Sequence, residues 1–237
     1  MAEVKKHWQF YIDKEGISWL SLDRHGEAVN TISQEVLLEL ECLLDEPTLL
    51  ASRGVVITSA KSSGFIAGAD IKQFSNCKSE EDFFEWIRHG QCIFDKLEAL
   101  PIPTVAMING FCLGGGYELA LACRYRVADD SASTKIGLPE IKLGIHPGWG
   151  GCIRLPKLIG ALPAMGVILP GSALPSKKAK KIGMIDQAVP LRQLRNAARY
   201  YILNQPKPHQ PSYLHARSNS RLYRPLLKPF LFFLYLN

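Results

Sequence analysis

Three consecutive glycines, Gly114 to Gly116, restrict the fold of this chain more than any other feature of its sequence. They follow the apolar, β-branched segment 104–110 and precede an apolar run, 117–122, that contains Glu118. This order predicts a buried strand, a tight turn and the start of a helix. The first N–H groups of a helix lack intrahelical partners, and a glycine backbone can be approached closely. The segment therefore predicts a site where backbone amides bind a phosphate or stabilise an oxyanion, with tight packing alone as the alternative.

The other hydrophobic patterns predict strands that alternate with helices. A short β-branched run is typical of a buried strand, and apolar residues at helical spacing after a serine indicate a capped helix. This alternation predicts an α/β fold in which helices cover the faces of a sheet. We expect strands at 16–23, 54–60, 104–110 and 125–132, and helices at 33–46 after Ser33, at 80–100 and at 176–183, the last ending at Gly183.

Four common motifs are absent from the sequence. No Lys-Ser/Thr pair follows the glycines, so they do not form a Walker loop, and Leu119 stands where a dinucleotide fingerprint starting at Gly114 needs its third glycine. No GxSxG segment indicates a hydrolase nucleophile. The six cysteines form no CxxC pair, so neither a zinc site nor a redox motif is indicated.

The net charge of +6 is distributed unevenly along the chain. From residue 176 onward there are twelve lysines and arginines and one acidic residue, Asp186. This excess favours a polyanionic partner for the C-terminal part, such as the phosphates of a ligand, nucleic acid or another subunit, with a solvated basic face as the alternative. The sequence contains no run of about 18 apolar residues, so no membrane span is expected. The polar N-terminus is unlike a secretory signal. The six cysteines are expected to be reduced and mostly buried thiols of a cytoplasmic protein.

A second turn rich in small residues follows another predicted strand. The segment 63–74 (SGFIAGADIKQF) exposes backbone at Ala67, Gly68 and Ala69. Asp70 is expected to be the N-cap of the helix that follows rather than a catalytic residue. Two such turns, each after a buried strand, can direct two N–H groups at one oxygen and so polarise a carbonyl group.

Two glutamates stand in apolar surroundings near these turns. Glu118 lies in the helical run after the glycines, and Glu140 follows Pro139 in the segment 136–151 (IGLPEIKLGIHPGWGG). Burial raises the pKa of a carboxyl group toward neutrality, where it can act as a general acid or base. Either glutamate alone is explained more simply as a surface or structural residue. Together with two amide turns, the pair indicates acid–base chemistry on a polarised carbonyl.

Four segments together resemble the enoyl-CoA hydratase/isomerase (crotonase) family. They are FIAGADI, INGFCLGGGYELALACRYRVA, GLPEIKLGIHPGWGG and AKKIGMID, and the similarity covers about residues 10–190 in the order and spacing of the family. Within the family, the likeness is to the N-terminal hydratase half of the multifunctional fatty-acid oxidation enzyme. The resemblance implies stacked ββα units in a superhelix, assembled as a homo-oligomer or as a subunit of a fatty-acid oxidation complex.

The resemblance also implies roles for the site residues. The N–H groups of Ala67 and Gly115 would hold the thioester oxygen of an acyl-CoA substrate. Glu118 and Glu140 would add water to its 2,3 double bond, with double-bond isomerisation as an additional activity. The substrate itself carries coenzyme A, so no separate cofactor and no metal is expected. Backbone of the two turns would line the acyl-CoA site, namely Gly68, Ala69, Asp70 and Gly114.

The resemblance divides the chain into two regions. Residues 1–190 are expected to form the hydratase core, and 191–237 a helical region that caps the site or contacts other subunits. Within the second region, the Pro-rich, polar segment NQPKPHQPSY at residues 204–213 is a further expected boundary, and the last residues are strongly apolar. In the multifunctional enzyme an NAD-dependent dehydrogenase follows the hydratase half. This chain has no dinucleotide fingerprint, so we expect truncation before that part, no NAD site and no hydride transfer.

Two other functions stay open at this point. A non-catalytic binding module would use the basic C-terminal face on nucleic acid or on another protein, but a pair of buried acids argues against it, and nucleic acid is not the expected partner. Another crotonase-family reaction, such as thioester hydrolysis or decarboxylation, would share the amide pair and differ in its acid–base groups.

Overall fold

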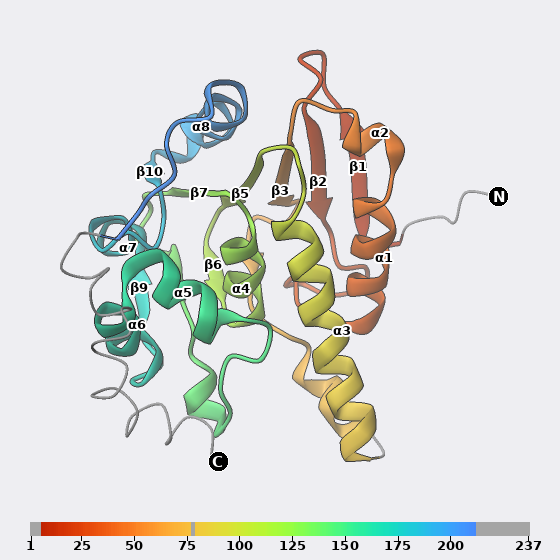
Figure 1. Cartoon of the computed structure of the whole chain (residues 1–237), viewed down its shortest axis with the longest axis vertical. Coiled ribbons are helices and arrows are strands. Elements are labelled where there is room, and N and C mark those ends of the chain that lie inside the picture. The colour runs from red at the N-terminus through yellow and green to blue at the C-terminus, as the bar shows by residue number, and fades with distance from the viewer. Residues whose placement is uncertain (1–5, 77–78, 212–237) are drawn as a thin grey trace.

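The computed structural model describes residues 6–76 and 79–211, and its strands form two sheets (Figure 1). The larger sheet contains, in spatial order, β1 (Trp8–Ile12), β2 (Ser18–Leu22), β3 (Val55–Ser59), β5 (Thr104–Ile108), β7 (Tyr125–Asp129) and β10 (Gln187–Val189). Its β1–β2 pair is antiparallel and its other pairs are parallel. The central strands are nearly continuous runs of buried residues, as expected for a parallel sheet that is covered on both faces.

Helices connect these strands and cover the sheets. Two of them begin at serine N-caps, because Ser33 Oγ accepts a hydrogen bond from the Val36 N–H and Ser79 Oγ accepts one from the Asp82 N–H. In the described part of the chain, no helix combines the length and the apolar character that a membrane crossing needs. The helices are α1 (Gln34–Leu44), α2 (Pro47–Leu50), α3 (Glu80–Glu98), α4 (Gly115–Ala122), α5 (Gly151–Ile159), α6 (Ala161–Ile168), α7 (Ser176–Lys181) and α8 (Leu191–Asn204), with 3-10 helices η1 (Ile71–Asn76) and η2 (Glu140–Leu143).

The smaller sheet contains, in spatial order, β4 (Gly64–Ile66), β6 (Phe111–Leu113), β8 (Lys135–Gly137) and the antiparallel β9 (Ala173–Pro175). Three successive ββα units connect the two sheets. In each unit the first strand joins the larger sheet, the second joins the smaller sheet and a helix returns the chain. The units are β3–β4–α3, β5–β6–α4 and β7–β8–α5. This arrangement confirms the expected α/β fold of stacked ββα units.

Most of the predicted elements are confirmed, with small shifts at their ends. The four predicted strands correspond to β2, β3, β5 and β7, and the first two predicted helices correspond to α1 and α3. The helix expected to end at Gly183 is shorter, since α7 ends at Lys181 and Gly183 adopts a φ of +87°. The three-residue strands of the smaller sheet were not predicted from the sequence, because a run of three residues is too short to show the alternation of apolar and polar residues that indicates a strand.

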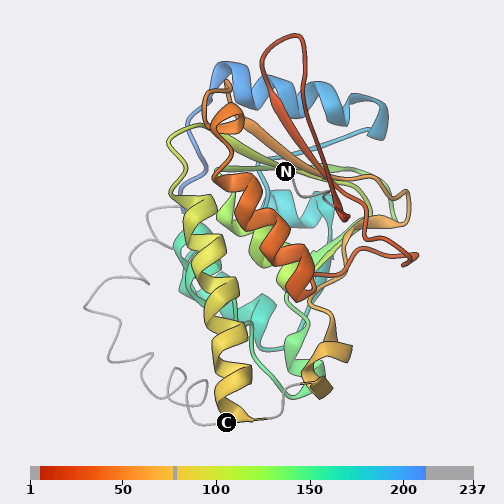
Figure 2. The same cartoon turned by 90° about the vertical axis from the view of Figure 1, so that its right-hand side faces the viewer.

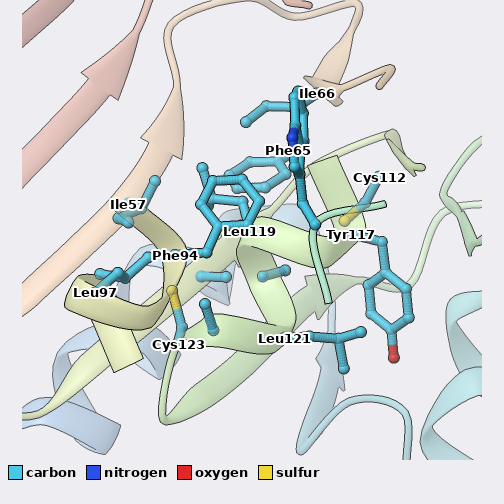
Figure 3. Packing of buried hydrophobic residues seen from close by; sticks show 14 of the residues in the cluster. Ile57, Phe65, Ile66, Phe94, Leu97, Cys112, Tyr117, Leu119, Leu121 and Cys123 are labelled. Atoms are coloured by element: carbon cyan, nitrogen blue, oxygen red, sulfur yellow. The ribbon is translucent and has the colours of Figure 1, made fainter. Parts of the chain in front are cut away.

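α4 is enclosed at the centre of the molecule. All of its residues are buried. Figure 3 shows Tyr117 and Leu119 of this helix among Phe65 and Ile66 of β4 and Phe94 of α3. Because protein interiors are close-packed, a helix enclosed in this way has little room to shift. Its first turn therefore provides a rigid base for the functional site.

α8 forms a second core on the other face of the larger sheet. Its residues Leu194 and Ile202 pack in one cluster with Trp19 of β2. Figure 2 shows α8 on one face of this sheet and α1 and α3 on the opposite face. α8 is the helix that the structure describes within the expected 191–237 region, and it lies against the larger sheet. A role of this region in capping the site or in contacting other subunits stays a prediction. Residues 212–237 lie outside the described residues.

Candidate active site

A cleft of about 1230 Å³ opens between the first turn of α4, the N-terminal half of α3 and the segment that follows β8. Its lining is mainly apolar and includes a small number of polar groups, as is usual for sites that bind small molecules. The expected site residues that line it are Ala67, Gly68, Ala69, Gly114, Gly115, Glu118 and Glu140, and Asp70 does not. The structure therefore brings both turns and both glutamates to one cavity.

Each of the three glycines is explained by a different neighbour. Gly114 has a φ of +53°, which favours glycine, and a Cβ there would lie 3.2 Å from Oε1 of Glu140. A Cβ on Gly115 would lie 2.5 Å from the ring of Trp149. A Cβ on Gly116 would lie 2.5 Å from a carbonyl oxygen of β4. The run therefore combines close packing with an accessible backbone.

The N–H groups of Ala69 and Gly115 form a pair of available donors in the cleft. Gly115 is the first residue of α4, so its N–H has no intrahelical acceptor. Ala69 is bridged to Ile32 through the hydrogen bonds of its two neighbours, so its own N–H is not used in that bridge. Ala69 N lies 3.4 Å from where a Cβ on Gly115 would be. Within the described residues neither N–H donates to an acceptor.

The expectation that Ala67 supplies one of the two amides is wrong. Its N–H already donates to the carbonyl oxygen of Asn30 at 2.9 Å. A substrate oxygen could bind this donor only if that hydrogen bond were broken. Ala69, two residues further along the same turn, has the amide that lies beside Gly115. The role of Gly115 itself stays a prediction.

The Glu118 side chain is held by the end of the segment between η2 and α5 and by the first residue of α5. Its Oε1 accepts hydrogen bonds from the N–H groups of Trp149 and Gly151, both at 2.8 Å. Burial first, and then the charge of Glu140, raise the pKa of Glu118 to about 8, although the two N–H donors favour its carboxylate form. No donor among the described residues contacts Oε2, which leaves this oxygen available for a ligand.

Glu140 is buried without a hydrogen-bond donor. It is the first residue of η2, it is 8% exposed, and neither of its carboxyl oxygens has a partner among the described residues. Burial raises its pKa to about 7. Because an unpaired buried polar group costs free energy of folding, such a group calls for a functional explanation. The two carboxyl groups therefore have the placement and the raised pKa values of a candidate acid–base pair.

Two residues to which the sequence analysis assigned no role also shape the site. The Trp149 indole is buried and packs edge-on against Trp86 and Phe94. Arg154 of α5 donates from Nη1 to the Trp149 carbonyl oxygen at 2.9 Å and pairs with two acidic residues of α3. The sequence signal for Arg154 is a single arginine in an apolar helical run, because a buried guanidinium needs acceptors.

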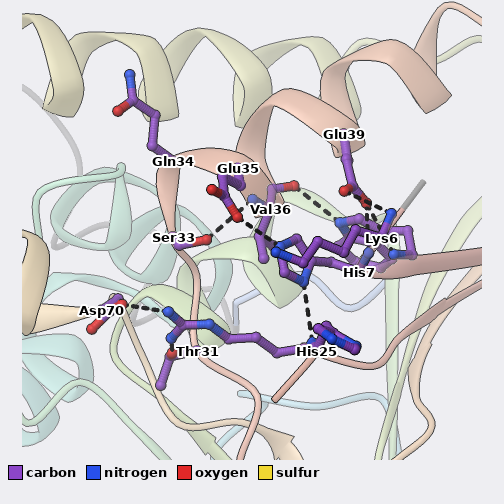
Figure 4. Close-up of polar contacts among 12 residues, drawn as sticks. Lys6, His7, His25, Thr31, Ser33, Gln34, Glu35, Val36, Glu39 and Asp70 are labelled. Atoms are coloured by element: carbon purple, nitrogen blue, oxygen red, sulfur yellow. Dashed lines mark hydrogen bonds and ion pairs between the residues drawn. The ribbon is translucent and has the colours of Figure 1, made fainter. Parts of the chain in front are cut away.

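Asp70 stabilises the turn at residues 67–70 from outside the cleft. Its Oδ1 accepts a hydrogen bond from the Lys72 N–H at 3.2 Å, in agreement with the predicted capping role, although the element that follows is the 3-10 helix η1. Its Oδ2 pairs with Arg24 at 2.5 Å. Figure 4 shows Asp70 at one end of a polar network that also contains His25 and His7. A role of Asp70 in lining the acyl-CoA site stays a prediction.

Residues 13–213 match the family model described as enoyl-CoA hydratase/isomerase. The chain belongs to the enoyl-CoA hydratase/isomerase family. Relatives include the fatty acid oxidation complex subunit alpha of Vibrio campbellii, 42% identical over 199 residues, and that of Shewanella loihica, 47% identical over 176 residues. These matches cover 84% and 74% of this chain but 28% and 25% of the relatives. The chain thus spans about a quarter of the length of the curated relatives it matches.

Solved structures of enoyl-CoA hydratase/isomerase family members share this fold. The enoyl-CoA hydratase of Bacillus anthracis has a TM-score of 0.76 at 33% identity, and the match covers 84% of this chain and 76% of that chain. A structure from Geobacillus kaustophilus HTA426 has a TM-score of 0.76 at 28% identity, with 83% and 73% covered. These likenesses confirm the crotonase fold, with two mixed sheets and a C-terminal helix.

Proposed function

We propose that this chain is an enoyl-CoA hydratase, which adds water across the 2,3 double bond of a 2-enoyl-CoA thioester in fatty-acid oxidation. One observation carries the proposal: a single cleft holds two available backbone amides and two buried carboxyl groups. The family, the relatives named as subunits of a fatty acid oxidation complex and the solved enoyl-CoA hydratases support the same activity.

The amide pair binds the carbonyl oxygen of the thioester in this mechanism. When water attacks C3, electrons move toward that oxygen and an enolate forms. The N–H groups of Ala69 and Gly115 donate to the developing charge. Because these donors are held in place before the reaction, they stabilise the transition state more than the substrate. One such donor is typically worth about 10²–10³ in rate.

Glu118 and Glu140 provide the two proton transfers. One carboxylate takes a proton from the water molecule whose oxygen bonds to C3, and the other carboxyl group gives a proton to C2, so the net change is the addition of one water. Two neighbouring buried carboxyls resist ionising together, and pKa values near neutrality let the pair hold one proton between them. Isomerisation needs the same groups to remove a proton from C2 of a 3-enoyl thioester and to return it at C4.

The substitutions Glu118→Gln and Glu140→Gln test this proposal. Each removes a proton-transfer group with little change in shape, so we expect hydration of crotonyl-CoA to fall about 10²–10⁴-fold. The loss of the conjugated absorbance of crotonyl-CoA measures the rate. Glu46→Gln is the control, because Glu46 lies outside the cleft and its side chain makes no capping hydrogen bond. This variant should keep wild-type activity.

Retained turnover in both glutamine variants would contradict the acid–base assignment. Release of free CoA in place of a hydrated thioester, measured by mass, would indicate thioester hydrolysis on the same fold. Flat absorbance together with salt-sensitive binding of RNA would favour the non-catalytic binding module. Assembly as a homo-oligomer or in a larger complex stays a prediction, which light scattering of the purified chain tests.

A further inference from the structure

Asn30 is a buried polar residue outside the cleft that the proposed mechanism does not use. It is 1% exposed and does not line the cavity. Its Nδ2 lies within hydrogen-bond distance of the Leu22 carbonyl oxygen at 2.9 Å, Ser59 Oγ at 2.8 Å and the Phe65 carbonyl oxygen at 3.2 Å. Its Oδ1 accepts a hydrogen bond from the Arg24 N–H at 2.9 Å. Acceptors on one side and a donor on the other hold the amide in a single orientation.

These contacts connect Asn30 to strands of both sheets. Leu22 and Ser59 are the last residues of β2 and β3 in the larger sheet, and Phe65 belongs to β4 in the smaller sheet. The turn that carries one of the two available amides follows β4 directly. Its first residue, Ala67, donates from its N–H to the carbonyl oxygen of Asn30 at 2.9 Å. Through its side chain and its backbone, Asn30 therefore fixes where this turn begins.

The backbone of the segment 30–32 holds the turn on both sides of Ala69. The Ile32 N–H donates to the carbonyl oxygen of Gly68 at 2.9 Å, and the Asp70 N–H donates to the carbonyl oxygen of Ile32 at 2.8 Å. The Gly68 carbonyl and the Ala69 N–H belong to one trans peptide group, so they point in opposite directions. Because the carbonyl faces Ile32, the Ala69 N–H faces away from this segment and toward the cleft that Ala69 lines.

The side chain of Arg24 connects the same segment to the same turn. Its guanidinium donates from Nη1 to Thr31 Oγ1 and pairs from Nη2 with Asp70 Oδ2 at 2.5 Å, and Figure 4 shows these contacts to Thr31 and Asp70. The Arg24 and Asp70 side chains are 14% and 9% exposed. None of Arg24, Asn30 and Asp70 lines the cavity. These residues can therefore affect a bound ligand only through the turn that they hold.

We propose that Asn30 is a positioning residue that directs the Ala69 N–H at the thioester oxygen from outside the cleft, and that Arg24 supports it. The inference rests on the proposed hydratase function and adds to it the residues that hold one donor in place. Donors that are fixed before the reaction stabilise developing charge without reorganisation. A displaced turn should therefore lower kcat more than it weakens binding of an unreactive thioester.

Asn30→Ala tests this proposal with two readouts. Its kcat on crotonyl-CoA should fall about tenfold to a hundredfold, while the Kd of butyryl-CoA stays within about threefold of the wild type. The infrared band of a ¹³C-labelled thioester carbonyl in bound butyryl-CoA should shift to lower frequency in the wild type and shift less in the variant, because N–H donors polarise the carbonyl group. Asn109→Ala is the matched control, since its Nδ2 also donates to a backbone carbonyl oxygen, that of Lys61 at 2.9 Å. Both readouts should match the wild type in this control.

Arg24→Met is a second, milder variant, because it keeps the buried Asn30 amide and removes only the contacts to Thr31 and Asp70. Its kcat should fall about threefold to tenfold with a partial loss of the infrared shift. An unchanged infrared shift in folded Asn30→Ala and Arg24→Met protein would overturn the positioning role, even with lowered melting temperatures, and would keep the hydratase. An infrared shift that depends on Asn30 in a protein that hydrates no enoyl thioester would refute the hydratase and keep the positioning role.

Discussion

At the scale of single residues, the chemistry depends on positions that carry no side chain. Gly90 and Gly115 leave the space that the Trp149 ring occupies. The N–H group of Trp149 holds Oε1 of Glu118 at 2.8 Å. The two glycines therefore position a candidate catalytic carboxyl group indirectly, through the tryptophan that they accommodate.

Gly115→Ala should disrupt this arrangement, because its Cβ would meet ring atoms of Trp149 at 2.5 and 2.7 Å. Overpacking of this kind typically costs about 1–3 kcal/mol, and the displaced turn should also lose hydratase activity. In a Trp149→Ala background the same substitution should cost little stability. Thermal unfolding of the four proteins of this double-mutant cycle measures the coupling. Additive effects of the two substitutions would show that the contact does not exist.

The buried glutamates predict that stability falls as pH rises. Folding raises the pKa of Glu140 from 4.5 to about 7, so between these values the unfolded chain releases a proton that the folded protein keeps. The stabilisation is complete below about pH 4.5 and is lost as the pH rises through about 7. Glu140→Gln does not titrate, so its melting temperature should fall less over this range than that of the wild type. Glu46→Gln should follow the wild type, and equal slopes for all three proteins would mean that folding does not raise the pKa of Glu140.

At the scale of elements, one short segment between η2 and α5 joins three helices. The N–H group of its Trp149 and that of Gly151, the first residue of α5, bind Glu118 of α4. Arg154 of α5 binds the Trp149 carbonyl oxygen and also contacts Asp95 and Glu98 of α3 at 2.6 and 2.8 Å. The position of Glu118 therefore depends on how α3, α4 and α5 are placed relative to one another.

Arg154→Gln should weaken both the fold and the proposed activity. The substitution leaves a buried carbonyl oxygen without its donor, which typically costs about 1–3 kcal/mol. A small displacement of the Trp149 segment should lower kcat by about tenfold to a hundredfold, because proton transfer depends on the placement of Glu118. Lys96→Ala on α3, the helix that carries the two acidic partners of Arg154, is the control, since the exposed Lys96–Asp45 pair contributes about 1 kcal/mol or less. Unfolding in urea and crotonyl-CoA turnover measure the two effects, and equal behaviour of both variants would argue against this role of Arg154.

At the scale of the whole molecule, two cores lie on opposite faces of the larger sheet. The core that contains α4 supports the candidate site. The core between the sheet and α8 contains none of the residues that line the cleft. Overall stability and local chemistry should therefore respond differently to substitutions in the second core.

Ile202→Ala tests this separation. Ile202 is 1% exposed, and removal of a buried isoleucine side chain typically costs about 2–5 kcal/mol. Below its lowered melting temperature, the variant should keep wild-type kcat on crotonyl-CoA. Leu191→Ala on the same helix should have little effect on either property, since Leu191 is 64% exposed. A strong loss of kcat in folded Ile202→Ala protein would mean that α8 is coupled to the site.

The parts of this protein that could be predicted from its sequence are those that depend on local patterns. β3 and β5 are short apolar runs, and Ser33 stands one residue before a helical period, so their structures follow from neighbouring residues. Glu118 and Glu140 were identifiable because each interrupts an apolar segment beside a turn. Arg154 was missed because its acidic partners, Asp95 and Glu98, lie on another helix.

The sequence by itself determined the alternation of strands and helices and the start of α4 at the glycines. Only the tertiary structure decided which amide is available beside Gly115, because the carbonyl oxygen of Asn30 occupies the N–H of Ala67 and leaves that of Ala69. It also decided where the Trp149 ring packs, since the ring needs the space left by Gly90 of a distant helix. The physical reason is that residue spacing sets the period of each element, whereas the partner of a hydrogen bond or of a packed ring is contributed by a segment far away in the chain.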